Sequence, residues 1–160
     1  MEFTQSVTYP GTVDEVVAMF LSPGYQERRF GSFLVPGSTT ASVEGGRITF
    51  SGDVRPELIP AAASRFVKGS LRTTFVEEWK RDEAMARSRS TLTVEGAPVS
   101  FEATSTLSSS DGGCTRTMTG NVSVRIPLFG GRIEREAVTH AGTVIEHERE
   151  LAAAWLAEHR

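Results

Sequence analysis

Several residue types are scarce in this sequence, and each scarcity excludes a class of protein. The 160 residues include one cysteine, Cys114, which excludes an internal disulfide framework and a cysteine-rich metal site. The 17 lysines and arginines do not outnumber the 20 aspartates and glutamates, so no broad basic surface is available for nucleic acid. The longest apolar run, 151–157, is far below the roughly 20 residues that cross a bilayer, and the first residues lack the pattern of a signal peptide. We therefore expect one domain over residues 1–160, a cytoplasmic location, no nucleic-acid partner and no integral membrane segment.

The first part of the sequence predicts one strand followed by two short helices. Apolar or large residues alternate with small polar ones over 3–9, which is typical of a half-buried strand. Thr12 and Glu15 have the spacing of a capping box at the start of the first helix. Pro23 suits the first turn of the second helix, and Gly31 is a suitable left-handed residue at its end.

From about Thr39 the hydrophobic period changes to two, which predicts six further strands. The turn signals suit antiparallel hairpins and occur at 44–46, 81–83, 95–98 and 110–113. Helical spacing near 57–68 predicts a short helix inserted in this meander, and a long amphipathic helix is expected over 132–159. The class is therefore α+β, with a curved antiparallel sheet of seven strands and one long C-terminal helix to cover it.

The chain also resembles a known family in its order of elements and in two segments. These are 126–134 (IPLFGGRIE) and the end of the last helix, 148–156. They are similar to the START-like superfamily, also called SRPBCC or helix-grip, and within it to an uncharacterised bacterial branch. The resemblance implies a seven-stranded sheet wrapped around the C-terminal helix, with a cavity between them that binds an apolar small molecule. In some relatives it implies cyclisation, dehydration or lipid transfer, but their catalytic residues match no positions here, and no cofactor is expected.

The inward faces of the predicted strands mix aromatic side chains with small ones, which fill little of the space beneath a curved sheet. Either a hollow remains there, or the helix comes close and large side chains such as Trp155 fill it. We expect a ligand-binding hollow lined by Phe50, Phe75, Glu77, Trp79, Ser88, Ser90, Phe101, Ser105, Arg116, Met118, Ala141, Val144 and Glu148. Four residues are expected at its mouth, either on a hinged gate or on loops that simply pack on the sheet: Phe30, Phe33, Ile59 and Phe66.

One carboxylate, Glu148, lies near the centre of the apolar arc of the long helix. Complete burial would raise its pKa by up to about 3 to 5 units, so it must stay protonated, find a cation or reach water. Glu77 and Arg116 also face inward by alternation, and we hypothesise that the three form a polar patch in an otherwise apolar cavity. The alternative is that a drift of the helix near Gly142 or a strand bulge places one or more of them at the rim.

Three functions remain open. We expect binding or transport of an apolar, lipid-like or polycyclic molecule, without catalysis. The first alternative is a cyclase or dehydratase in which Glu77 or Glu148, with a raised pKa, donates a proton. The second is a protein-interaction module with a vestigial cavity. No metal site is expected, because His140, His147 and His159 lack the three- or four-residue spacing that places two imidazoles on one ion.

Overall fold

The computed structural model describes residues 1–59, 61–65, 67 and 69–160, and it has the predicted α+β architecture. Its elements, in chain order, are β1 (Glu2–Tyr9), α1 (Val13–Phe20), α2 (Pro23–Phe30), the 3-10 turn η1 (Gly31–Phe33), β2 (Thr40–Glu44), β3 (Arg47–Asp53), the 3-10 turn η2 (Pro56–Leu58), α3 (Ala61–Ser64), β4 (Arg72–Asp82), β5 (Met85–Val94), β6 (Val99–Ser110), β7 (Gly113–Val124) and α4 (Gly130–Glu158).

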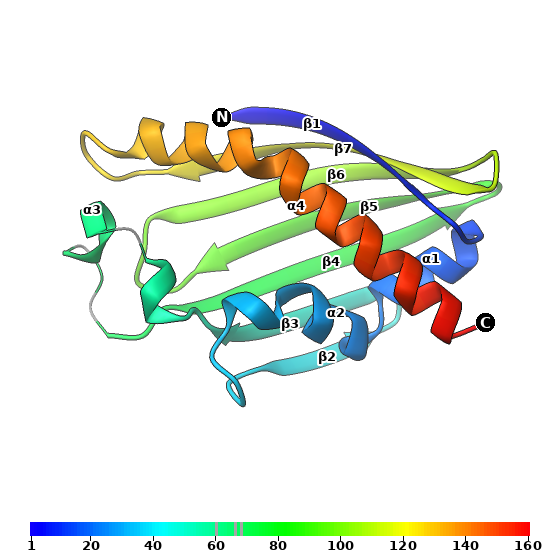
Figure 1. Cartoon of the computed structure of the whole chain (residues 1–160), viewed down its shortest axis with the longest axis horizontal. Coiled ribbons are helices and arrows are strands. Elements are labelled where there is room, and N and C mark those ends of the chain that lie inside the picture. Colours follow the sequence, from blue (N-terminus) through cyan, green and yellow to red (C-terminus); the bar gives the residue numbers. More distant parts are fainter. Residues whose placement is uncertain (60, 66, 68) are drawn as a thin grey trace.

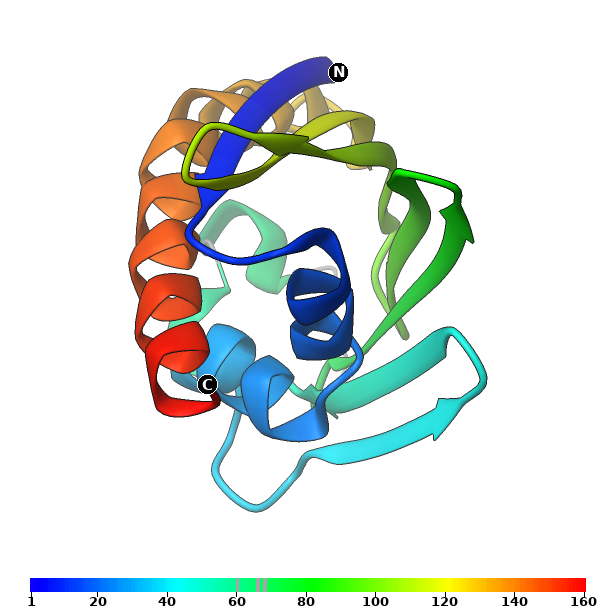
Figure 2. The ribbon, with the colours of Figure 1, turned by 90° about the vertical axis from the view of Figure 1, so that its right-hand side faces the viewer.

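The seven strands form one antiparallel sheet in the order β1-β7-β6-β5-β4-β3-β2. The register places Glu77 opposite Ser90 and Ser105 opposite Met118, so side chains from neighbouring strands meet on the same face. Burial alternates along β4 to β7 as the sequence predicts, and the sheet curls around its buried face (Figure 2). The predicted curved sheet of seven strands is confirmed.

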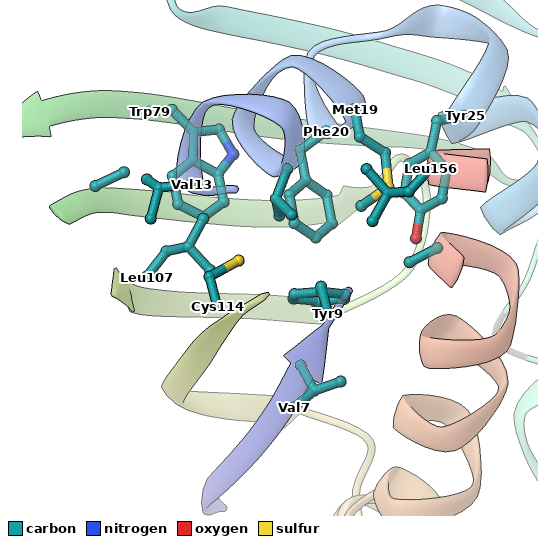
Figure 3. Packing of buried hydrophobic residues seen from close by; sticks show 13 residues of the cluster. Val7, Tyr9, Val13, Met19, Phe20, Tyr25, Trp79, Leu107, Cys114 and Leu156 are labelled. Atoms are coloured by element: carbon teal, nitrogen blue, oxygen red, sulfur yellow. The ribbon is translucent and has the colours of Figure 1, made fainter. Parts of the chain in front are cut away.

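The concave face of the sheet is covered by α4 and by the two short helices. The long helix crosses the sheet obliquely, contacting β1 and β7, and its C-terminal part reaches α1 and α2 (Figure 1). The main hydrophobic core lies at this end, where Phe20 of α1 stacks on Trp79 of β4 with ring centroids 5.5 Å apart. Tyr9, Leu107 and Leu156 complete its centre (Figure 3).

Local sequence signals explain the boundaries of the short elements, with two corrections. The capping box is confirmed: Glu15 N–H donates to Thr12 Oγ1 (3.1 Å) and Thr12 N–H donates to Glu15 Oε1 (3.0 Å). The prediction of a left-handed Gly31 is wrong, because its φ is −56° and the chain continues directly into η1. The predicted insertion helix is divided into η2 and α3, and Phe66 lies outside the described residues.

The long helix is fixed at its two ends and stands away from the sheet between them. At its start, Gly130 lies so close to Val124 that a Cβ would be 2.1 Å from the Val124 carbonyl oxygen. Toward its end, Glu148, Ala152 and Leu156 are buried, whereas no residue of 131–147 is fully buried. A space therefore remains under the middle of α4. None of the described helices is both long and apolar enough to span a membrane.

Candidate functional site: an apolar cavity with a buried ionic network

A cavity of about 450 Å³ lies between the middle of α4, the inner faces of β1 and β4 to β7, and the segment α2–η1. Its wall consists mainly of apolar and aromatic side chains, and it is formed by Phe3, Gln5, Arg29, Phe30, Phe33, Phe75, Ser90, Leu92, Phe101, Arg116, Met118, Val122, Ala137, Val138, Ala141, Thr143, Val144, Ile145, His147, Glu148 and Leu151. Phe33 and Val144 are 45% and 53% exposed, so the cavity opens to solvent between η1 and α4.

The space persists because small side chains face it from both layers. Ala137 and Ala141 present only a methyl group from the helix, and Ser90 presents a short side chain from β5. On the sheet, Gly120 makes room for the ring of Phe3, because a Cβ at this position would be 2.7 Å from that ring. A close-packed interior would need larger side chains at Ser90, Ala137 and Ala141.

Glu148 is the centre of a buried ionic network at the inner end of the cavity. Its Oε2 accepts a hydrogen bond from Arg29 Nε (3.0 Å), and Arg29 Nη2 lies 2.8 Å from the same oxygen. Its Oε1 accepts from Tyr9 Oη (2.9 Å) and lies 3.7 Å from Arg116 Nη1. The helix carboxylate is thus paired with one arginine from α2 and another from β7.

Glu77 is the second carboxylate of this network and is completely buried in β4. Its Oε2 accepts from Ser90 Oγ (2.9 Å) and from Arg116 Nη2 (3.4 Å), and it lies 4.0 Å from Arg29 Nη1. Its Oε1 accepts from the indole N–H of Trp79. We use the term ionic network for Arg29, Glu77, Arg116 and Glu148. These four residues join α2, β4, β7 and α4 and carry no net charge together.

The pKa values follow from this pairing. Burial alone would raise the pKa of Glu148, but Arg29, Arg116 and the hydrogen bonds from Tyr9 and Arg29 outweigh it and hold that pKa below its ordinary value. Burial and the adjacent Glu148 raise the pKa of Tyr9 well above its usual range, so the phenol stays a hydrogen-bond donor. Of the three outcomes expected for a buried Glu148, the structure shows pairing with cations, because Arg29 and Arg116 lie within ion-pair distance.

The structure brings the predicted polar patch together and places many predicted residues in the cavity wall. Glu148 and Arg116 are in the wall, while Glu77 lies directly behind Arg116, so none of the three is at the solvent-exposed rim. The wall also contains the predicted residues Phe75, Ser90, Phe101, Met118, Ala141 and Val144, and the predicted mouth residues Phe30 and Phe33.

Some predicted lining residues share the inward faces but lie away from the cavity. Trp79 is covered by Phe20 of α1, and Ser88 is buried opposite Trp79 on the neighbouring strand β5. Phe50 is covered by Phe30, with ring centroids 5.9 Å apart. Ser105, like Glu77, lies behind Arg116 and accepts a hydrogen bond from its Nε (2.9 Å). Alternation predicts the face of a strand but not which helix covers each part of it.

Two further findings concern the loops. Ile59, which was predicted at the mouth, instead lines a separate apolar hollow of about 160 Å³ near the start of α4. Arg29 was missed altogether, although it reaches both carboxylates and its guanidinium lies 5.0 to 5.3 Å from the ring centroids of Phe20, Phe30 and Phe75. Among the described residues, no group of histidine, cysteine and carboxylate side chains is arranged to hold a metal ion.

Comparison with known proteins identifies the family. The family described as "Protein of unknown function (DUF2505)" matches residues 4–156. The chain belongs to this family. An uncharacterised protein of Mycobacterium tuberculosis is 27% identical, with 96% of this chain and 95% of that protein covered.

Solved structures resemble this DUF2505 chain in fold. The protein TTHA0849 from Thermus thermophilus has a TM-score of 0.58 at 16% identity, covering 96% of this chain and 98% of that one. The di-domain ARO/CYC protein StfQ from the steffimycin biosynthetic pathway has a TM-score of 0.60 at 10% identity. The similarity to StfQ covers 99% of this chain and 51% of StfQ. These neighbours support the helix-grip fold for the chain.

Proposed function

We propose that this protein binds, and carries or senses, an apolar small molecule in the cavity beneath α4, as a START-like (SRPBCC) domain. The observation that carries the proposal is the cavity itself. Its volume of about 450 Å³ is within the range of small-molecule sites, and its wall is mostly apolar with a few convergent polar groups. The fold similarity to StfQ, a protein of a biosynthetic pathway, supports a role with small molecules.

The ionic network favours binding over proton-transfer catalysis. A general acid must hold its proton near the working pH, but Arg29 and Arg116 hold the pKa of Glu148 below its ordinary value. Glu77 is completely buried and engaged by Trp79, Ser90 and Arg116. These contacts favour binding over the cyclase or dehydratase alternative.

A bulky substitution in the cavity wall tests the proposal. Ala141→Trp fills the space from α4, while His140→Trp places the same side chain at the adjacent, exposed position of the helix. The wild-type protein and the His140→Trp variant are expected to bind the neutral apolar dye N-phenylnaphthylamine, measured by fluorescence. Ala141→Trp is expected to lose at least tenfold in affinity, and equal dye affinity in all three proteins would overturn the proposal.

Native mass spectrometry of protein purified from its source identifies the natural molecule. A co-purifying small molecule that is present in the wild-type protein and absent from Ala141→Trp would support the proposal. An empty wild-type protein that neither binds the dye nor copurifies with a small molecule would instead favour the protein-interaction alternative.

A further inference from the structure

The two arginines of the ionic network have more N–H groups than the network has acceptors. Each guanidinium carries five N–H groups. Arg116 is 1% exposed, and its Nη1 has no hydrogen-bond partner among the described residues, lying 3.7 Å from Glu148 Oε1. Arg29 Nη1 donates a long hydrogen bond to Gln26 Oε1, at 3.4 Å, and lies 4.0 Å from Glu77 Oε2. Both side chains form part of the cavity wall.

The carboxylates have no corresponding deficit. Glu148 accepts hydrogen bonds from Tyr9 and Arg29 on its two different oxygens. Glu77 accepts from Trp79, Ser90 and Arg116. The unpartnered Nη1 of Arg116 and the long hydrogen bond of Arg29 Nη1 leave donor capacity at the inner end of the cavity, which favours a group that accepts a hydrogen bond.

From this donor excess we infer that the bound molecule has an apolar body and, at one end, an oxygen acceptor that binds the guanidinium groups of Arg29 and Arg116. The inference rests on the proposed function and specifies the ligand class. The Arg29 side chain is 12% exposed and lies against the rings of Phe30 and Phe75, which also form the cavity wall. The apolar body would lie against these rings and the acceptor against the guanidiniums. A carboxylate and a ketone share this acceptor chemistry, whereas an alkylammonium offers only donors to two cations.

Three probes of equal chain length separate these cases: dodecanoate, the corresponding methyl ketone and dodecylammonium. Each is used to displace N-phenylnaphthylamine from the wild-type protein. Dodecanoate or the ketone, or both, are expected to bind at least tenfold more tightly than dodecylammonium. Their relative affinities distinguish an anionic acceptor from a neutral one. Dodecylammonium that displaces the dye as well as both acceptors would overturn this inference while leaving the proposed cavity binding intact. Absence of binding by the dye and by every probe would overturn the proposed function.

Two variants assign the contact to Arg29. Arg29→Met is expected to weaken the preferred acceptor probe roughly ten- to hundredfold, the range for loss of a charge-assisted hydrogen bond. Arg28→Met is the matched control, because Arg28 is the adjacent arginine of α2 but pairs with Glu158 at the surface, so acceptor affinity is expected to stay within twofold. If the Arg29→Met variant still binds the dye, its cavity is intact and a weaker acceptor affinity reports the lost contact; if dye binding is also lost, the cavity itself has changed. If Arg29→Met does not fold, the charge-balanced Arg29→Met/Glu148→Leu variant replaces it, and an unchanged acceptor affinity in the folded variant would overturn the assignment.

Discussion

Removing the carboxylate of Glu148 should destabilise the protein much more than removing it together with Arg29. The Glu148→Leu substitution leaves Arg29 and Arg116 facing each other with Glu77 as the remaining counter-charge. The oxygen of Glu148 lies 2.8 Å from Arg29 and 3.7 Å from Arg116, which correspond to Coulomb attractions of about 6 and about 4.5 kcal/mol at an effective dielectric of 20. The carboxylate's own desolvation offsets much of this, so the expected net loss is about 3 kcal/mol, the lower end for a broken buried pair.

The double variant Arg29→Met/Glu148→Leu removes one charge of each sign and leaves the Arg116–Glu77 pair. Because apolar replacement of a whole buried pair is often neutral or stabilising, we expect its stability to lie within about 1 kcal/mol of the wild type. Urea unfolding followed by circular dichroism gives the free energies. For a chain of 160 residues the single variant should also lower the Tm by roughly 6 to 12 °C.

Glu146→Leu provides the matched control for this experiment. Glu146 is on the same helix and pairs with Arg149, but it is exposed, so little change in stability is expected. A double variant that is as unstable as Glu148→Leu would refute the reasoning. A Glu148→Leu protein that is more stable than the wild type would do the same, since it would mean that the ionic network holds no favourable pairing.

Three further predictions concern pH, a close backbone approach and the thiol. The pKa of Glu148 is lower in the folded protein than in the unfolded chain, where it is near 4.5. The ionised carboxylate therefore stabilises the fold fully above about pH 4.5, and this contribution is lost as pH falls through the folded pKa. In urea titrations, the difference in unfolding free energy between wild type and Glu148→Gln should shrink below about pH 4.5. Gly130→Ala should lower the Tm clearly, because its Cβ would lie 2.1 Å from the Val124 carbonyl, whereas Gly142→Ala, with open space around it, should not. Burial raises the pKa of the Cys114 thiol to about 11, so a thiol reagent should label it only in urea, and rapid labelling of the native protein would contradict this.

The sequence was sufficient to predict three members of the ionic network. In an antiparallel sheet the side chains alternate strictly, so Glu77 and Arg116 could be assigned to the inner face from their positions relative to apolar neighbours. Glu148 could be assigned from the helical period in the same way. Their meeting required only that the long helix lie across that face.

Arg29 could not be predicted, because its role depends on how one short helix packs. Arg28 and Arg29 are adjacent in α2, and either could have faced inward. In the structure Arg28 lies over the Trp155 ring and pairs with Glu158, whereas Arg29 turns under α4 to reach Glu148. Which of the two arginines faces inward depends on the rotation of α2 about its own axis, and that rotation is set by tertiary packing.

For a similar reason, the sequence could not predict which inward-facing residues line the cavity and which belong to the solid core. Trp79 and Phe75 are four residues apart on the same face of β4, yet Trp79 is packed under Phe20 and Phe75 lies in the cavity wall. The difference arises because α1 and α2 fill one end of the concave face, where the predictions had assigned the covering role to the long helix alone. The hydrophobic period of a strand predicts which side chains face inward, but not which of them pack in the core and which line the cavity.

The ionic network lies where the solid core ends and the cavity begins, and this position gives it two effects. Arg116 lies between the core and the cavity, with its guanidinium 4.6 Å from the Phe20 ring centroid on one side and its side chain in the cavity wall. Through Arg29 and Glu148 the same network fixes α2 to α4. Glu148 is the first buried residue of the C-terminal part of α4, next to the part of the helix that stands away from the sheet. The residues that attach the helix are therefore the same residues that form the polar end of the cavity. A molecule that accepts a hydrogen bond from the remaining N–H groups of Arg29 binds the same guanidinium that holds Glu148, so binding at this end and the attachment of α4 should be energetically coupled.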